Sequence, residues 1–166
     1  MEFSPNLTPR EILEAGAFGG CYFGLPQVKI YNDFNYQDLF EKTLVGIDPD
    51  LYLRKSYSAK ANKFRTKAGL DYKEWKDAGW MHEDDPYGWF EWYLKYDAGR
   101  RHPDDARQIK RWNDFCGPRG RWRRRIYSRI HETRSWAASP RIQQSLLHWG
   151  YEVNSEDYEI WRNQYA

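Results

Sequence analysis

Apolar residues recur along the chain at helical spacings of three and four, and helix-capping sequences separate these runs. Thr8-Pro9-Arg10-Glu11 combines an N-cap hydroxyl, a proline suited to the first helical turn and an acid that completes a capping box. It predicts a helix that stops at the glycine-rich segment 16–20. Comparable signals predict helices over 36–44, 71–79, 85–99, 102–116, 121–134 and 139–150, with one last turn from 154 or 155.

Strand signals are few and short, limited to Tyr22-Phe23 and residues 27–31. We therefore predict a mainly α fold, with at most short strands. A chain of 166 residues suits a single compact multi-helix domain over 1–166. Because 18% of the residues are aromatic, the core should be aromatic-rich.

The predicted helix 85–99 carries aromatic residues on most of its faces. Such a helix is typical of the middle of a bundle, and Glu91 with Lys95, four residues apart, would mark its wet edge. In the next helix we expect Ala106, Ile109, Trp112 or Asn113, and Cys116 to face inward. The expected core includes Trp89, Trp92, Tyr93, Trp112, Ile126 and Leu146.

Positive charge is concentrated in one part of the chain, although the net charge is only +2. Residues 100–134 contain twelve Lys and Arg against four acids. A loop over 54–69 holds a second basic run without any acid, and its candidate anion-binding residues are Lys60, Lys63, Arg65 and Lys67. Such clusters are typical of a surface that meets an anionic partner.

Within the predicted helix 121–134, Trp122, Ile126 and Ile130 form an apolar stripe. The other faces carry arginines with few acids nearby, because Glu132 is the one acid between residues 119 and 134. Arginine is the preferred side chain for bidentate phosphate contacts, although a solvated helix face is the alternative. The candidate phosphate-binding residues here are Arg121, Arg124, Arg125 and Arg129, preceded by Arg107 and Arg111.

The sequence "CGPRGRW" predicts a tight connection between two helices. Gly117 and Gly120 bracket it, and the next helix would direct free N–H groups toward the turn. Together with Arg119 and Arg121 these groups could hold a phosphate, while a plain helix–helix turn is the alternative.

The segments "HEDD" (82–85) and "HPDD" (102–105) resemble two halves of a metal site. A straight helix of about 14 residues between them would be roughly 20 Å long, so we expect them at opposite ends and predict no metal. Acids at helix N-termini are the alternative role.

No nucleophile elbow, phosphate loop, dinucleotide fingerprint or HExxH sequence occurs, and we predict no cofactor. An enzyme remains an alternative, with Asp85, Arg100, Arg101 and Asp105 as candidate catalytic residues. Its small phosphorylated or carboxylated substrate would be held by Arg100, Arg101, Arg107 and Arg111.

Neither a signal sequence nor an 18-residue apolar run is present. Cys21 and Cys116 lack metal-ligand spacing, as ordinary thiols in a reducing compartment would. We therefore expect a cytoplasmic protein that has no membrane partner.

Three stretches together resemble a small family of intracellular proteins found in bacteria, plants, fungi and some viruses. They are "LTPREILEAGAFGGCYF", "KDAGWMHEDDPYGWFEWYLKYDAGRRHPDDARQIKRW" and "SPRIQQSLLHWGYE". They match a TPxE-type start, a GW–DPxGWFxWY–GRR–DxRQIxRW centre and a terminal QxLLxW segment, so the likeness covers nearly the whole chain apart from 26–68. The resemblance implies one soluble domain and no particular reaction. It draws attention to Asp85, Arg100, Arg101, Asp105, Arg107 and Arg111.

The charge pattern favours a nucleic-acid-binding protein that contacts the phosphates of DNA or RNA through residues 119–129 and the basic loop, without a predicted base specificity. Besides the enzyme, a module that binds an acidic protein is a further alternative.

Overall fold

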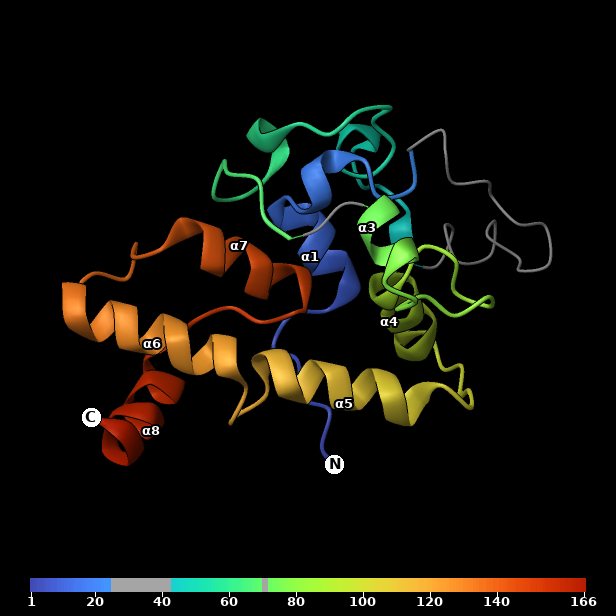
Figure 1. Ribbon diagram of the computed structural model, residues 1–166. Helices are drawn as coiled ribbons and strands as arrows, with labels where there is room; N and C mark the ends of the chain where they lie inside the picture. The colour runs from blue at the N-terminus through green and yellow to red at the C-terminus, as the bar shows by residue number, and fades with distance from the viewer. Residues whose placement is uncertain (25–42, 70–71) are drawn as a thin grey trace.

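The computed structural model describes residues 1–24, 43–69 and 72–166, and it confirms the mainly α fold (Figure 1). Helices dominate this part of the chain, and its one β-like pairing is an isolated bridge between His82 and Asp85. The α-helices are α1 (Pro9–Ala15), α3 (Tyr72–Asp77), α4 (Trp89–Asp97), α5 (Asp105–Cys116), α6 (Arg121–Thr133), α7 (Pro140–His148) and α8 (Ser155–Tyr165). The short 3-10 turns are η1 (Phe18–Gly20), η3 (Pro49–Leu51) and η4 (Ala59–Ala61).

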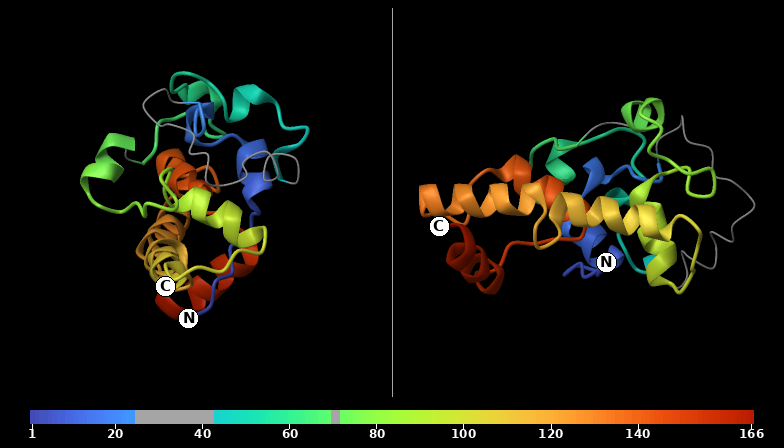
Figure 2. Two further views of the ribbon diagram at one scale, coloured as in Figure 1. Left: turned by 90° about the vertical axis from the view of Figure 1, so that its right-hand side faces the viewer. Right: turned by 60° about the horizontal axis from the view of Figure 1, so that its bottom comes forward.

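Helices α5 and α6 follow one another as an almost straight rod along one side of the molecule (Figure 2). Helix α7 runs back beside α6, and α8 packs on another side of α6. Helix α4 crosses near the start of the rod and contacts α1. The basic loop 54–69 lies across α7 from α6, so the two basic regions are separated (Figure 1).

The core is rich in aromatic residues, as the composition predicts. All six residues expected in the core are buried, and Trp92 and Trp112 are fully excluded from solvent. Phe3 completes the centre, because its ring lies within 5.2–6.2 Å of five aromatic rings from α4 and α5. The N-terminal segment therefore closes the space between these two helices.

Helix α1 begins as its capping sequence predicts. The Thr8 hydroxyl accepts a hydrogen bond from the backbone N–H of Glu11, and the Glu11 carboxylate accepts one from the N–H of Thr8. Gly16 ends the helix with a φ of 102°, and a Cβ there would lie 2.4 Å from the carbonyl oxygen of Ala61. Glycine thus allows the basic loop to pack directly on the end of α1.

Three predictions about the elements are wrong. Helix α8 has 11 residues rather than one turn, and Tyr22-Phe23 lies in a turn rather than in a strand. In α5 Trp112 and Cys116 face inward as predicted, together with Gln108, but Ala106 is exposed. The predicted strand 27–31 and most of the predicted helix 36–44 lie outside the described residues.

Candidate functional site

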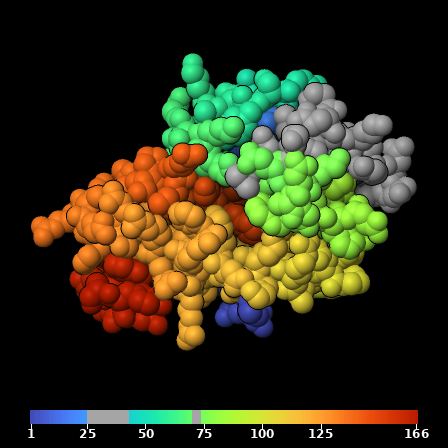
Figure 3. Space-filling view, in the orientation of Figure 1, coloured from blue at the N-terminus to red at the C-terminus, as the bar shows by residue number. Residues whose placement is uncertain are grey.

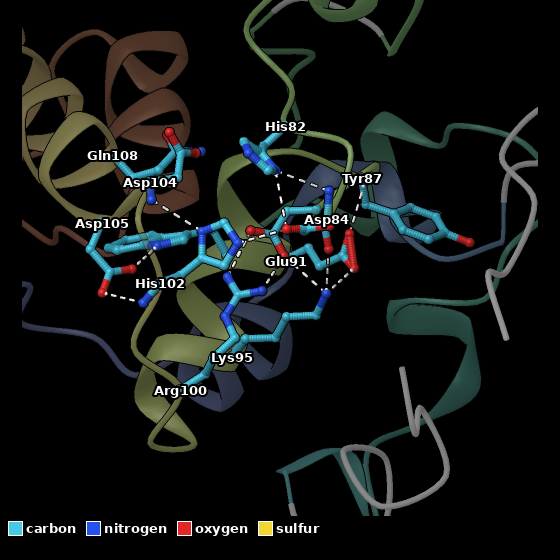
Figure 4. Close-up of polar contacts among 12 residues, drawn as sticks. His82, Asp84, Tyr87, Glu91, Lys95, Arg100, His102, Asp104, Asp105 and Gln108 are labelled. Carbon is cyan, nitrogen blue, oxygen red and sulfur yellow. Dashed lines mark hydrogen bonds and ion pairs between the residues drawn. The ribbon is translucent and has the colours of Figure 1, made fainter. Parts of the chain in front are cut away.

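A buried ion cluster joins the two ends of α4 (Figure 4). The Asp85 carboxylate is fully buried and accepts two hydrogen bonds from the Arg100 guanidinium, at 2.9 and 2.7 Å. The Lys95 ammonium lies 2.9 Å from the same carboxylate and 3.2 Å from that of Glu91. Two carboxylates and two cations therefore meet inside the protein, each with a partner of opposite charge.

The expected distance of about 20 Å between Asp85 and Arg100 is wrong because the chain bends back at both ends of α4. Helix α4 has only nine residues, and the segment before it runs alongside it so closely that Lys95 donates a hydrogen bond to the carbonyl of Asp84. At the other end Gly99 has a φ of 107°, and the backbone N–H of Arg100 donates to the carbonyl of Lys95. Asp85 and Arg100 consequently form a direct ion pair.

The prediction of a wet edge at Glu91 and Lys95 is also wrong. Their exposed fractions are 0% and 2%. Helical spacing identified the pair correctly, but Asp85 arrives from outside the helix and covers it. The polar stripe of α4 is thus an internal ionic contact, which stabilises the bend of the preceding segment.

The HEDD and HPDD segments meet, contrary to the sequence expectation. Nε2 of His102 lies 2.7 Å from an Asp84 carboxylate oxygen, and Nδ1 of His82 lies 3.7 Å from it. These three side chains could together offer ligands to a metal ion. The hydrogen bond from His102 also lowers the pKa of the exposed Asp84 carboxyl.

The hydrogen bonds around His102 oppose metal binding in the present ring state. Nδ1 accepts a hydrogen bond from the backbone N–H of Asp104, at 3.1 Å. A neutral imidazole has one N–H, so the proton must lie on Nε2, the atom that faces Asp84. Nε2 would have to lose this proton before it could bind a metal.

The remaining candidate catalytic residues have structural partners. Asp105 accepts hydrogen bonds from Nε1 of Trp92 and from the backbone N–H of His102. Arg101 donates to two backbone carbonyls and lies 3.8 Å from the centre of the Tyr96 ring. Asp85 is inaccessible to a substrate, so the structure does not bring these residues together in an open site.

Arg107 and Arg111 differ although they are one helical turn apart. Arg107 forms two hydrogen bonds with the Asp104 carboxylate. Burial raises the pKa of Asp104, but the contact with Arg107 and the nearby His82 and His102 together lower it. Within the described chain Arg111 has no carboxylate within 4 Å, and it donates to the Gln108 side chain and to the carbonyl of Trp80. Burial, assisted by the charge of Arg107, lowers the pKa of Arg111 to about 10.

The turn before α6 and the first half of that helix present a group of exposed arginines. No carboxylate of the described residues pairs with them, whereas Arg129, one turn further on, is bound to Glu132 at 2.8 Å. Arg123 is buried and donates to the carbonyl of Cys116. The group, which we call the α6 arginine surface, consists of Arg119, Arg121, Arg124 and Arg125.

The turn before α6 is as tight as the sequence predicts. A Cβ at Gly117 would lie 2.7 Å from the Asn113 side chain, and one at Gly120 would lie 2.7 Å from the backbone of Phe115 and Cys116. Gly120 is also the N-cap, so no side chain caps the helix, and its first turn contains no acid. The N-terminus of α6 thus lies beside Arg119 and Arg121, and in the described part of the chain no carboxylate forms an ion pair with either arginine.

A cleft of about 790 Å³ opens between the segment 75–81 and helices α5, α6 and α7. Figure 3 shows this hollow between the green segment and the yellow and orange helices. Its lining is mainly aromatic, and Arg111, Arg121 and Arg141 border it. No sequence pattern predicted this cleft, because its lining residues are scattered between Phe18 and Trp149.

The basic loop 54–69 is held in place by Asn62. The side chain of Asn62 accepts a hydrogen bond from the N–H of Gly19 and donates to the hydroxyl of Tyr57 and to the carbonyl of Thr66. The loop's candidate anion-binding residues are exposed, but Lys63 is paired with Glu152. This loop therefore presents fewer unpaired charges than its sequence indicates.

In the described helices no apolar span is long enough to cross a bilayer. Both cysteines are buried free thiols, and burial raises their pKa values. Comparisons with models of protein families, with curated proteins and with solved structures found no match.

Proposed function

We propose that this protein binds nucleic acid through the α6 arginine surface, which contacts the phosphates of DNA or RNA. The supporting observation is that four exposed arginines cluster at one helix end and no described carboxylate pairs with them. Guanidinium groups bind phosphate oxygens bidentately, and such contacts need no base sequence.

The position of these charges on the helix supports the proposal. A helix N-terminus carries a partial positive charge that favours acids, yet the first turn of α6 has arginines and no acid. Charge repulsion therefore disfavours this arrangement in the free protein. A bound phosphate would relieve that repulsion and accept hydrogen bonds from the uncapped backbone N–H groups.

The alternative enzyme site has less support. Two of its four substrate-binding arginines, Arg100 and Arg107, are paired with carboxylates, and Arg101 is bonded to backbone carbonyls. Neither Arg101 nor Arg111 pairs with a carboxylate of the described residues, and of these two Arg111 borders the cleft. An acidic protein would also suit the α6 arginine surface. The test must therefore measure the contribution of phosphate contacts to binding.

The salt dependence of binding tests this proposal. Four phosphate contacts should give a slope of log K against log salt of about −3.6 on duplex DNA and about −2.8 on single strands. Replacing Arg124 and Arg125 with Gln should flatten the slope by about 1.8 or 1.4, respectively. Titration of fluorescent oligonucleotides at several salt concentrations measures both values.

A control variant with an equal change in charge is available in the basic loop. Lys60→Gln combined with Lys67→Gln removes two exposed cations on the far side of α7. We expect this pair to change the slope by much less than the α6 pair. Absence of binding to every oligonucleotide at about 50 mM salt would contradict the proposal and favour an acidic protein partner.

A further inference from the structure

The cleft beside α6 has one continuous aromatic wall. The rings of Trp122, Phe115, Trp149 and Trp89 follow one another with centroids 5.9, 5.0 and 4.7 Å apart. Trp80 borders the same cleft, and 40% of its surface is exposed. Phe115 and Trp149 are stacked and the other two neighbouring pairs are tilted, so this row and the exposed indole of Trp80 offer several ring faces to a planar ligand.

Three arginines border this aromatic space. The guanidinium of Arg111 lies 5.8 Å from the centre of the Trp80 ring and 5.4 Å from that of Trp149. Arg121 and Arg141 lie in the first turns of α6 and α7, and neither turn contains an acid. Over the described ranges no carboxylate forms an ion pair with any of the three, although Asp114, bound to Lys110, also borders the cleft.

His148 adds a neutral hydrogen-bond donor to the lining. Its Nε2 accepts hydrogen bonds from the N–H of Phe18 and from the Gln144 side chain, so the ring proton lies on Nδ1. Among the described residues this N–H has no partner. Burial lowers the pKa of His148 to about 3, and the ring therefore stays neutral at physiological pH.

We propose that the cleft binds a nucleotide, with its base against the aromatic wall and Trp80 and its phosphate on Arg121 and Arg141. The two halves of the ligand match the two kinds of lining. Aromatic faces stack on bases of any sequence, and guanidinium groups hold phosphate. A volume of about 790 Å³ lies within the usual range for pockets that bind small molecules.

The nucleotide could be free or could be an unstacked unit of a single strand. Both sources present the same chemistry, and Arg121 connects the cleft to the α6 arginine surface. Binding of a free nucleotide does not depend on the proposed nucleic-acid function, because that measurement contains no strand.

Calorimetric titration with AMP, adenosine, ribose 5-phosphate and inorganic phosphate tests both halves. AMP should bind at least about tenfold more tightly than the other three, because each of them lacks the base or the phosphate. Equal affinity for inorganic phosphate and AMP would overturn the role of the base. Equal affinity for adenosine and AMP would overturn the role of the arginines.

Two variants locate the binding in the cleft. Trp80→Ala and Arg141→Gln should each weaken AMP binding by about tenfold, since each removes one stacking surface or one charged donor. Both side chains are exposed, so the fold should persist. Trp136→Ala and Lys55→Gln remove an exposed indole and an exposed cation outside this cleft, and they should leave AMP affinity unchanged. Equal effects of cleft and control variants would refute the site.

Competition identifies the source of the nucleotide. If the cleft holds an unstacked base of a strand, AMP should displace a fluorescent single-stranded oligonucleotide but not a duplex. If AMP binds without displacing the strand, the cleft serves a free nucleotide, and both results support the site. Absence of AMP binding together with undisturbed strand binding would overturn the cleft proposal while leaving the α6 arginine surface supported.

Discussion

The buried ion cluster around Asp85 and the arginine-lined cleft both contain charged and aromatic side chains. They differ in whether their cations are paired with carboxylates. In the cluster, the cations of Lys95 and Arg100 lie within 3 Å of the Asp85 carboxylate. In the cleft, Arg121 and Arg141 have no such partner in the described part of the chain, and Arg111 contacts rings and neutral oxygens.

This difference separates structural from candidate ligand-binding charge. A cation that a protein carboxylate already neutralises holds the fold and gains little from an external anion. A cation that no protein group neutralises can bind an anion without first breaking an internal contact. Sequence alone does not distinguish these cases, because Arg100 and Arg111 occur in the same aromatic, arginine-containing segment.

The largest expected effect belongs to the cluster. Asp85→Asn leaves Lys95 and Arg100 facing a neutral amide inside the protein, so the free energy of unfolding should fall by about 3–5 kcal/mol. Denaturant unfolding followed by circular dichroism measures the change. Asp114→Asn, in an exposed pair with Lys110, should cost at most about 1 kcal/mol. Similar losses in the two variants would show that the buried cluster has no special structural role.

The pattern of apolar residues predicted the helices well, since α5, α6 and α7 each bury an inward stripe. It could not predict the cluster, because Asp85 reaches Lys95 only after the chain turns back before α4. The length of α8 was missed since it buries no residue fully, although Asn154 and Asp157 form a cap signal in the sequence.

The α6 arginines were identified from charge, but the cleft could not be. Trp80, Phe115 and Trp149 come from segments 34 or more residues apart, and no periodicity links them. Nor does the sequence show that three of the candidate phosphate-binding residues, Arg107, Arg129 and Lys63, are paired with carboxylates. Partners supplied by the fold, rather than residue type, decide which charges remain for a ligand.

A smaller effect on the free energy of unfolding should come from His148, which lines the cleft, as the pH changes. Burial lowers the pKa of His148 from 6.5 to about 3. Between these two pH values His148 is protonated in the unfolded chain but neutral in the folded protein. Stability should therefore fall as pH drops below 6.5, by about 2 kcal/mol at pH 5. Unfolding curves at several pH values, compared between the wild type and His148→Gln, measure this contribution. An identical pH dependence in both proteins would contradict it.

The smallest expected effect is a gain in the free energy of unfolding, and it comes from a substitution at the edge of the cleft. Arg121 is the first residue of α6, where the helix dipole favours a negative charge. Arg121→Glu should therefore raise the free energy of unfolding by about 0.3–1 kcal/mol while weakening both AMP and oligonucleotide binding. Arg162→Glu in the last turn of α8 places the same charge at the unfavourable end of a helix and should lower stability. Thermal melts at low ionic strength measure both shifts, and a destabilised Arg121→Glu protein would mean that Arg121 serves the fold, as Arg100 does, rather than a ligand.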